Sequence, residues 1–388
     1  MGSKTRIAYD GTVYSSQARG GISRYYTRVI EEMASLRPAW EFDLHIIDDG
    51  TAPAPLPCGD NISITKRKYF RPAWCCVPLN YGSRQNRIRK ARPSLLHTTL
   101  ARPFHYPPCP VVITIHDTIM EKLPEFYSDR GFARSKRWWQ WSATHADAVL
   151  TVSNTSRADI IETWSAAPSR VHVTYPGVDR VFSRQVPEEV SSVLAAYRLK
   201  RPYILYVGHR GEHKNFRVLA AAIQDSALQE LDLVLVGGTD RVPELEGWPG
   251  LEGKRLHHLK RVTDNELRSL YSGAAALVFP SLYEGFGFPL VEAMSCGAPV
   301  VSSDIPSSRE VCGDIAEYFR PREPDDCVKA ILRVRDREDR DSSIRRGIER
   351  AKLFNWSSCA HETIRIYEDL IERGRHRQPE MALQQGSS

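Results

Sequence analysis

The chain has 388 residues with a formal net charge of +6; 41% of its residues are hydrophobic and 26% are charged. This balance excludes an intrinsically disordered chain, and the length favours two domains of ordinary size. The sequence has no run of about 18 apolar residues and no signal-peptide pattern, so we expect a cytoplasmic protein without a membrane span.

Short apolar runs, each close to a turn signal, alternate with helical patterns along the whole chain. Many of these runs are almost continuous in Val, Ile and Leu, as is typical of strands buried on both faces of a parallel sheet. The predicted strands are 5–10, 42–48, 94–99, 111–117, 148–153 and 171–175, followed by 203–208, 231–237, 255–260, 275–281, 299–304 and 317–319.

Helical spacing of apolar residues predicts helices over 21–33 and 215–225. Alternation of strands and helices in both halves predicts an α/β chain with two doubly wound, Rossmann-like domains that face each other across a cleft. We expect the N-terminal domain at 1–178 and the C-terminal domain at 190–356, joined by a linker at 175–189 that is rich in Pro and Gly.

The amphipathic helix 357–374 follows the second domain, and the polar tail 375–388 is predicted to lack regular structure.

The segment FPSLYEGFGFPLVEAMSCGAPVVSSD at 279–304 carries the most chemical information. Glu284 ends a loop after a buried strand, and Gly285 and Gly287 allow close approach of the backbone to a ligand. A helix is predicted from about Pro289 until Gly297 stops it. Its N-terminal N–H groups suit a phosphate, and Glu292, inside the first turns, suits the two hydroxyls of a ribose.

Two further loops supply groups of the same kind. After the strand 203–208, Gly208 is followed by Arg210 and Lys214, a planar fork and a point charge that together suit a diphosphate. After the strand 255–260, Arg261 and Val262 precede a helix and predict a wall for a nucleotide base.

These three segments resemble the GT-B-fold retaining glycosyltransferases of family 4, the glycogen-synthase-like and mannosyltransferase-like group. The resemblance rests on two glutamates in EGFGFPLVE, on the diphosphate loop YVGHRGEHKN, on the Gly-Gly pair before the first helix and on the His-Asp pair at 116–117. It covers essentially the whole chain. One departure is His213, where many relatives carry an arginine before the lysine.

The resemblance implies that Glu292 holds the ribose and that Glu284 faces the transferred sugar. Arg210 and Lys214 would neutralise the diphosphate, and Val262 would meet the base through its backbone. The implied catalytic residues are therefore His116, Glu284, Lys214 and Arg210.

His116 would contact the sugar from the N-terminal domain, Gly21 would let the first loop approach the phosphates, and the last helix would cross back to the first domain. The other positions expected to line the donor site are Gly208, Gly285, Phe286, Gly287 and Leu290.

The resemblance implies a hexosyltransferase that takes a nucleotide-sugar, with GDP-mannose favoured, and transfers the hexose to a glycan or lipid-linked oligosaccharide in surface polysaccharide synthesis. The only Asp-x-Asp pattern, Asp339 to Asp341, lies in a highly charged run typical of a solvated helix face, so we expect no metal and no cofactor. A nucleotide-sugar epimerase, a phosphorylase and a binding protein without turnover remain alternatives.

Basic and aromatic residues cluster at 66–74, 84–93 and 134–141. They are interpreted either as a solvated face with partly buried tryptophans or as a contact with an anionic membrane that carries a lipid-linked acceptor. No recognition motif accompanies the charge, so a nucleic-acid partner is not expected.

Overall fold

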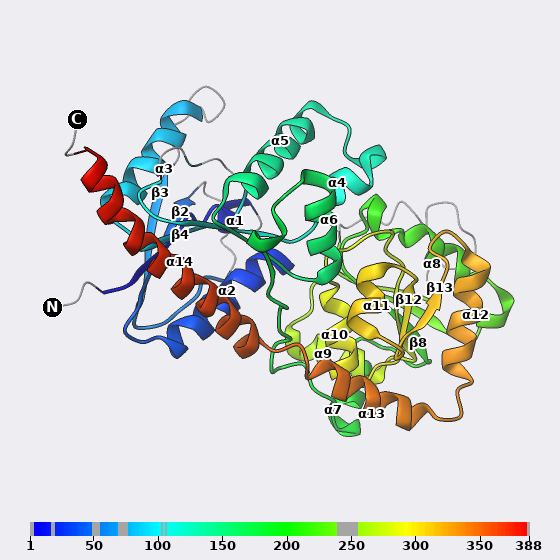
Figure 1. The fold of residues 1–388 in the computed structure, drawn as a ribbon. Helices are drawn as coiled ribbons and strands as arrows, with labels where there is room; N and C mark the ends of the chain where they lie inside the picture. Colours follow the sequence, from blue (N-terminus) through cyan, green and yellow to red (C-terminus); the bar gives the residue numbers. More distant parts are fainter. Residues whose placement is uncertain are drawn as a thin grey trace. The chain divides into compact units, whose positions relative to one another are not determined.

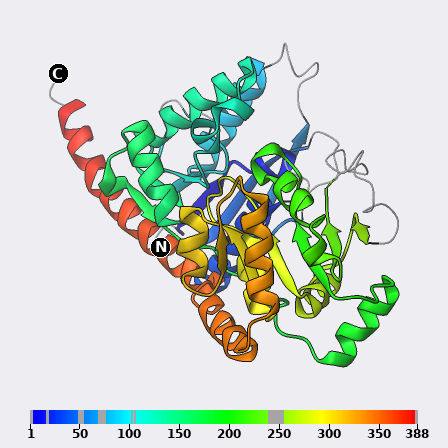
Figure 2. The ribbon, with the colours of Figure 1, turned by 90° about the vertical axis from the view of Figure 1, so that its right-hand side faces the viewer.

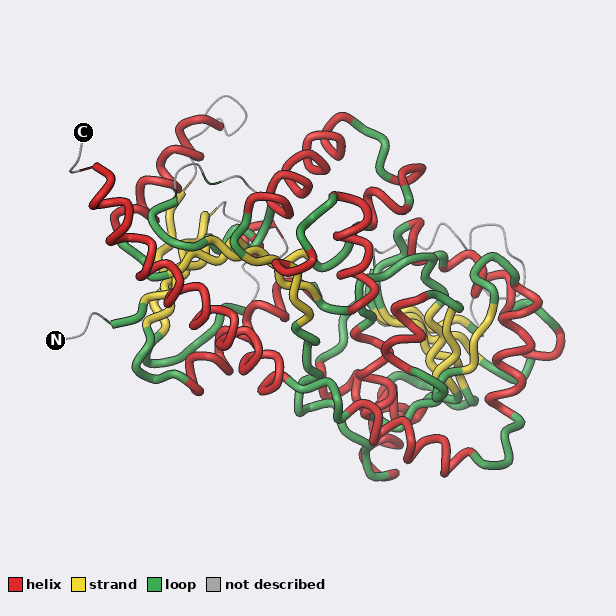
Figure 3. Tube along the Cα trace, in the orientation of Figure 1, coloured by secondary structure: helices red, strands yellow, loops and turns green. Residues whose placement is uncertain are grey.

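The computed structural model of the chain describes residues 4–16, 20–48, 55–68, 77–101, 104, 107–238 and 255–385. It consists of two compact units. The first contains Met1–Glu121, Tyr127–Gly177 and Trp356–Ser388, and the second contains Lys122–Phe126 and Val178–Asn355. Figure 1 labels the elements, and Figure 3 shows helices on both sides of the strands in each unit.

The first unit is built on a sheet of strands in the order β3-β2-β1-β4-β5-β6-β7, in which each pair of neighbours is parallel. The chain runs outward from β1 to β3 on one side and then returns to place β4 to β7 on the other. The strands are β1 Arg6–Tyr9, β2 Glu41–Asp48, β3 Ile62–Lys68, β4 Leu95–Thr98, β5 Val111–Ile115, β6 Ala148–Thr151 and β7 Val171–Val173.

Helices lie between several of these strands, as the crossovers of a parallel sheet require. In chain order they are α1 Val13–Ser16, α2 Gly21–Leu36, α3 Val77–Ala91, α4 Ile119–Lys122, α5 Arg130–His145, α6 Asn154–Trp164 and the 3-10 helix η2 Pro168–Arg170. The 3-10 helix η1 Pro124–Phe126 lies between α4 and α5 in the chain but belongs to the second unit. The last helix, α14 Trp356–Gln385, also belongs to this unit and packs beside α2. There the hydroxyls of Tyr367 and Tyr9 lie 2.9 Å apart in the core.

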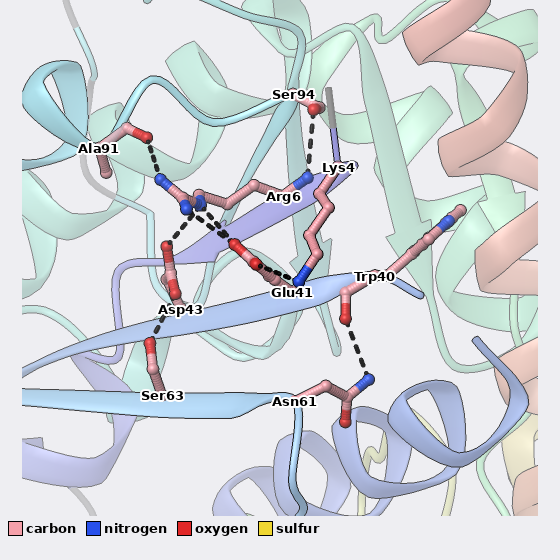
Figure 4. Close-up of polar contacts among 9 residues, drawn as sticks. All are labelled: Lys4, Arg6, Trp40, Glu41, Asp43, Asn61, Ser63, Ala91 and Ser94. Atoms are coloured by element: carbon pink, nitrogen blue, oxygen red, sulfur yellow. Dashed lines mark hydrogen bonds and ion pairs between the residues drawn. The ribbon is translucent and has the colours of Figure 1, made fainter. Parts of the chain in front are cut away.

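A polar network at the amino end of β1 fixes the start of the sheet (Figure 4). The guanidinium of Arg6 donates to Glu41 Oε2 of β2 at 2.7 Å and to the carbonyl of Ala91 at 3.0 Å. Its backbone N–H donates to the hydroxyl of Ser94 at 3.2 Å. Since Ala91 is the last residue of α3, these bonds attach the end of that helix directly to β1 and β2.

The second unit contains a parallel sheet in the order β10-β9-β8-β11-β12-β13. Its strands are β8 Tyr203–Val207, β9 Asp232–Val236, β10 Leu256–Leu259, β11 Ala276–Phe279, β12 Val300–Ser303 and β13 Glu317–Phe319. Its helices are α7 Pro187–Ala196, η3 Glu212–Lys214, α8 Phe216–Ala222, η4 Ser226–Leu228, α9 Asp264–Gly273, α10 Phe288–Ser295, α11 Pro306–Cys312, α12 Pro324–Arg335 and α13 Arg340–Ala351.

The core of the second unit lies between its sheet and the helices that cover it. Apolar residues of α8 and α12 pack against the strands, and Figure 2 shows the ribbon of α12 alongside the sheet. The strands β8, β9, β11 and β12 are almost entirely buried, with Leu233, Leu235 and Ile204 at 0% exposure, whereas the edge strand β10 is partly exposed. Burial on both faces explains why these strands read as continuous apolar runs in the sequence.

Each predicted strand is found, within the predicted range or one residue beyond it. Four parts of the chain differ from the sequence expectation. The strand β3 and the helix α3 were not predicted, and Lys122–Phe126 belongs to the second unit. The prediction of an unstructured tail at 375–388 is wrong as far as Gln385, because α14 continues to that residue. The tail is rich in good helix formers and extends an existing helix, so no new nucleation is needed.

Candidate functional site

The expected donor-binding loops all follow strands of the second sheet at its carboxyl edge. The chain places β9 and β10 on one side of β8 and places β11, β12 and β13 on the other. The order of strands therefore reverses between β8 and β11, and such a reversal opens a crevice in which α/β sheets bind ligands. The loops after β8 and β11 carry the two motifs that the sequence singled out.

Lys214 and Glu284 meet at this reversal. The Nζ atom of Lys214 donates to Oε1 of Glu284 at 2.6 Å, and the two side chains are 23% and 15% exposed. The ammonium group also lies 5.9 Å from the centre of the Phe279 ring at the end of β11. The structure thus brings together the cation and the carboxylate from the two motifs, 70 residues apart in sequence, in a partly dry setting where their charges interact strongly.

Hydrogen bonds to backbone carbonyls hold these two loops against each other. Asn215, which adopts a left-handed conformation with φ of 52°, donates from its side-chain amide to the carbonyl of Pro280 at 3.0 Å. The N–H of Leu282 donates to the carbonyl of His213 at 2.8 Å. Both bonds join the β8 loop to the β11 loop, so the position of Lys214 relative to Glu284 is fixed by the backbone as well as by the ion pair.

His213, which directly precedes Lys214, does not supply a second charge. Burial and the neighbouring Lys214 ammonium lower the pKa of His213 below its usual value. The imidazole is therefore neutral near pH 7. Lys214 and Arg210 remain as the cations of this loop.

Arg210 is held against the loop after β9. Its Nη1 donates to the carbonyl of Gly237 at 3.2 Å. A Cβ added at Gly238 would come within 2.5 Å of the same guanidinium, and Gly238 has φ of +84°. Glycine at 238 therefore leaves the space in which the Arg210 fork lies. Gly208, with φ of +133°, has no atom within 4 Å of its Cβ position, which leaves open space beside the strand end.

The glycine loop before α10 differs in part from the expectation. Gly287 directly precedes the helix with φ of +108°, a conformation that glycine adopts without strain. Gly285 does not have a positive φ. The N–H of Leu290 donates to the carbonyl of Gly287 at 3.0 Å, within the first turn of α10. Phe286 is buried, with its ring 5.3 Å from that of Phe354.

Glu292 lies inside α10 and is only 7% exposed. Its Oε2 accepts a hydrogen bond from the hydroxyl of Tyr271 in α9 at 2.9 Å. This bond orients the carboxylate within α10. Glu292 thus contacts α9, whereas Glu284 contacts Lys214 of the β8 loop.

Val262 follows β10 at the carboxyl edge and is half-buried. It directly precedes Thr263, whose hydroxyl accepts from the N–H of Glu266 in a capping box that starts α9. The next strand in the sheet is β9, whose loop contacts Arg210.

Two predicted site residues belong to the first unit and are described there alone. His116 directly follows β5, and its ring lies 5.0 Å from Tyr25 and 6.0 Å from Tyr26. Burial lowers the pKa of His116 to about 4, and its Nε2 atom is buried without a hydrogen-bond partner. Gly21 is the exposed first residue of α2, and the preceding Gly20 is fully extended, so neither needs the conformational freedom of glycine.

Within the described ranges, no group of three or more His, Cys, Asp or Glu side chains has the arrangement of a metal site. Asp339 and Asp341 are exposed at the start of α13. A search of the same ranges for helices long and apolar enough to cross a membrane finds none. Of the basic and aromatic clusters, residues 69–74 lie outside the described part, and Trp138 and Trp139 are partly buried against the core.

Known proteins share these features. Residues 195–351 match the family model described as glycosyl transferases group 1, and residues 19–182 match the model of Glycosyltransferase Family 4. The O-antigen chain mannosyltransferase B of Escherichia coli is 33% identical over 272 residues, which cover 66% of this chain and 70% of that protein. The chain belongs to the family 4 glycosyltransferases.

Further comparisons agree with this assignment. An MMP alpha-(1->4)-mannosyltransferase of Mycolicibacterium hassiacum is 29% identical to the family 4 glycosyltransferase described here over 287 residues, covering 68% of this chain and 66% of the relative. A sucrose-phosphate synthase structure from Thermosynechococcus elongatus superposes with a TM-score of 0.78 at 21% identity, covering 95% of this chain and 100% of that one. The two parallel-sheet, Rossmann-like units are therefore those of the GT-B fold.

The sequence did not point to three contacts of this glycosyltransferase: the Tyr271 hydroxyl on Glu292, the Gly238 space for Arg210, and the Asn215 amide that joins the two loops. The glycines at 237–238 end a predicted strand and could have been noticed as a turn at the ligand edge. The other two depend on side-chain orientation, which no local pattern encodes.

Proposed function

We propose that this glycosyltransferase transfers mannose from GDP-mannose, with retention of the anomeric configuration and without a metal or cofactor, to a glycan or lipid-linked oligosaccharide in surface polysaccharide synthesis. The observation that carries the donor site is the Lys214–Glu284 pair at the reversal of strand order. Mannose is favoured because both relatives described above are named as mannosyltransferases.

The transfer requires groups that stabilise negative charge on the diphosphate as its bond to the sugar breaks. The bond between the anomeric carbon and the diphosphate oxygen lengthens, and negative charge grows on the leaving phosphate. The Lys214 ammonium, the Arg210 guanidinium and the positive end of the α10 dipole interact more strongly with that charge as it develops, which lowers the barrier. These groups do the work that a divalent cation does elsewhere.

Retention follows if the acceptor attacks from the face that the diphosphate leaves. The acceptor hydroxyl oxygen forms the new bond to the anomeric carbon, and its proton passes to the departing phosphate oxygen. No enzyme carboxylate is needed as a nucleophile in this scheme. Glu284, paired with Lys214, would orient the transferred sugar, and Glu292 would hold the ribose.

A panel of nucleotide-sugars tests the donor. We expect GDP-mannose to raise the melting temperature of the protein more than UDP-, ADP- or dTDP-sugars do, because binding to the folded state stabilises it by mass action. Transfer to a mannoside acceptor in the presence of EDTA, followed by NMR of the product, should give the α-anomer at an unchanged rate. A larger shift with UDP-glucose, a β-linked product or loss of activity that manganese restores would each overturn that part of the proposal.

The same assay separates the alternatives. A nucleotide-sugar epimerase would convert the donor without any acceptor, and a binding protein would show the thermal shift without product.

Contact with an anionic membrane also remains a proposal. It rests on cations such as exposed Arg134 and Arg137 of α5 more than on tryptophan, because Trp138 and Trp139 pack against the core.

A further inference from the structure

One backbone oxygen in the loop after β9 accepts hydrogen bonds from two side chains of the second unit. The carbonyl of Gly237 accepts from Nη1 of Arg210 at 3.2 Å, and Nε2 of His258 in β10 lies 3.0 Å from the same oxygen. A carbonyl oxygen can only accept, so the imidazole carries its proton on Nε2 and donates it. The cation expected to meet the diphosphate thus shares its acceptor with a histidine that no sequence motif singled out.

The turn that carries this oxygen is not stiff by itself. Gly237 and Gly238 have φ of +88° and +84°, and glycine keeps more backbone freedom than any other residue. Contacts must therefore set the direction of the carbonyl. The N–H of Gly237 donates to the carbonyl of Leu259 in β10 at 3.0 Å. Together with the bond from His258, this contact attaches both backbone polar groups of Gly237 to β10.

The turn after β8 lies directly beside this one. A Cβ placed on Gly237 would lie 3.5 Å from the carbonyl oxygen of Gly208, and the N–H of Gly208 donates to the carbonyl of Val236 at 3.0 Å. Arg210 lies two positions after Gly208. A rotation of the Gly237 carbonyl would therefore remove the acceptor of the arginine and disturb the turn from which its side chain extends.

Two adjacent histidines of β10 bond to opposite ends of β9. The Nε2 atom of His257 lies 2.9 Å from Oδ2 of Asp232, the first residue of β9. His258 instead reaches the turn at the carboxyl end, where the donor loops lie. Successive side chains of a strand point to opposite faces, which explains why two neighbours have such different partners. The strand thus offers a matched pair of histidines, one linked to Arg210 through Gly237 and one bonded at the far end of β9.

We propose that His258 is a positioning residue of the donor site, which holds the Gly237 carbonyl in the direction that orients the Arg210 guanidinium. Arginine has several N–H donors in a fixed fork, so it can keep this bond and still meet phosphate oxygens. A cation that is oriented in advance stabilises developing charge without having to reorganise. The inference rests on the proposed function, because it assumes that Arg210 neutralises the diphosphate. His258 itself touches neither substrate in this assignment.

The test uses the full chain with His258→Phe, which keeps an aromatic ring and removes the Nε2 donor. We expect the KM for GDP-mannose to rise about fivefold, the usual effect of one lost neutral hydrogen bond. The KM for a methyl α-mannoside acceptor should stay that of the wild type. A purely structural role would instead reduce the amount of active protein, and with it the apparent kcat, at an unchanged donor KM. An unchanged donor KM in folded His258→Phe would overturn the proposal.

Rescue and control variants lie on the same strand. His258→Gln places an amide nitrogen as many bonds from Cβ as the imidazole Nε2, so it should keep the wild-type donor KM. His258→Asn carries its amide nearer to the backbone and should behave like His258→Phe, which it replaces if that variant does not fold. The matched control is His257→Phe, which should lower the melting temperature without changing the donor KM. An equal rise of the donor KM in His257→Phe would indicate a general loosening of β10 and refute the role of His258.

A double-mutant cycle with Arg210→Ala tests whether the histidine acts through the arginine. Calorimetry measures the dissociation constants of GDP and of UDP for the wild type, the two single variants and the double variant. In the Arg210→Ala background, His258→Phe should raise the constant of the tighter-binding nucleotide by less than about twofold, because the effects of coupled residues do not add. The full rise in that background would mean that His258 acts independently of Arg210, against the proposal.

The two proposals fail in different ways. If no nucleotide-sugar gives product but nucleotide binding shows the coupling, the proposed transfer reaction is wrong and the role of His258 stands. If product forms and Arg210→Ala weakens donor binding while His258→Phe does not, the role of His258 is wrong and the transfer stands. If product forms and Arg210→Ala leaves nucleotide binding unchanged, neither residue serves the diphosphate, and the inference falls while the transfer stands.

Discussion

The Nζ atom of Lys214 and the Oε1 atom of Glu284 lie 2.6 Å apart, across the point at which the strand order of the second sheet reverses. The lysine comes from the loop after β8 and the glutamate from the loop after β11. Two backbone-directed bonds, from Asn215 and from Leu282, already join these loops. The cation expected to meet the leaving diphosphate is therefore oriented before the donor arrives, and such preorganisation is where electrostatic catalysis gains most.

Replacing Lys214 with alanine should lower the rate of transfer by about a hundred- to thousand-fold, which is the usual effect of removing one fixed donor from a developing negative charge. Steady-state kinetics with saturating donor measures this loss. The matched control is Lys352→Ala, which removes an exposed lysine paired with Glu349 in the same unit and should leave the rate unchanged. A rate within threefold of the wild type in Lys214→Ala would remove the lysine from the diphosphate site.

Gly238→Ala should weaken donor binding through Arg210. The new methyl group would fall within 2.5 Å of the guanidinium, so the arginine must leave its bond to Gly237. We expect the donor KM to rise about tenfold, equivalent to about 1.4 kcal/mol, and the left-handed backbone to cost about 1–2 kcal/mol of stability.

Gly313→Ala separates strain from displacement of the arginine. Gly313 also has positive φ, at +60°, but the guanidinium carbon of Arg350, the nearest atom outside its chain neighbours, is 3.8 Å from the Cβ position. This control should lose stability without any change in donor KM. An equal rise of the donor KM in both variants would show that Arg210 is not the cause.

The sequence predicted the strands well because almost all of them are buried on both faces and therefore form continuous apolar runs. It also predicted that both motifs lie at the donor site, whereas the ion pair between Lys214 and Glu284 was found only in the structure. The edge strand β3 was missed because ISITKRK alternates Ile with polar residues and is largely exposed. The helix α3 was missed because its many basic residues obscure the apolar face.

Contacts between distant residues were beyond any local pattern. Asp10 and Arg84 are 74 positions apart, and nothing in either neighbourhood indicates that one buries its charge against the other. The same holds for the first turn of α10, in which the N–H of Leu290 donates to the carbonyl of Gly287. Whether the first N–H groups of a helix are available depends on the geometry of its first turn, which the sequence GFGFPL does not specify.

Glu292→Gln should weaken donor binding without disturbing the fold. The amide keeps the shape of the side chain and can still accept the bond from Tyr271, but it loses the charge-assisted bond to a ribose hydroxyl. We expect the dissociation constant of the donor, measured by calorimetry, to rise about ten- to thirtyfold, equivalent to roughly 1.5–2 kcal/mol.

Tyr271→Phe is the companion variant. It removes the bond that orients Glu292 and should cost about 1 kcal/mol of stability with a smaller rise in the dissociation constant. If Glu292→Gln binds GDP-mannose and GDP equally well as the wild type, the carboxylate does not hold the ribose.

The stability of the protein should fall as the pH is lowered from about 6.5 to 4. Burial lowers the pKa of His116 to about 4 and the pKa of His97 to about 3, below the ~6.5 of histidine in the unfolded chain. In this range the unfolded state binds more protons than the folded state, so the free energy of unfolding rises with pH and levels off above about 6.5. Each histidine accounts for a loss on the order of 2–3 kcal/mol across the window.

Urea unfolding of the wild type and of His116→Gln at several pH values checks this slope. The variant should show a shallower fall between pH 6.5 and 4, because one of the histidines that must be charged on unfolding is absent. His361→Gln, an exposed histidine of α14, should keep the wild-type slope. His116 is neutral between pH 6 and 8. The pH profile of the transfer rate in that range should therefore have the same shape in His116→Gln as in the wild type. Identical slopes in the wild type and His116→Gln would mean that His116 is not buried as described.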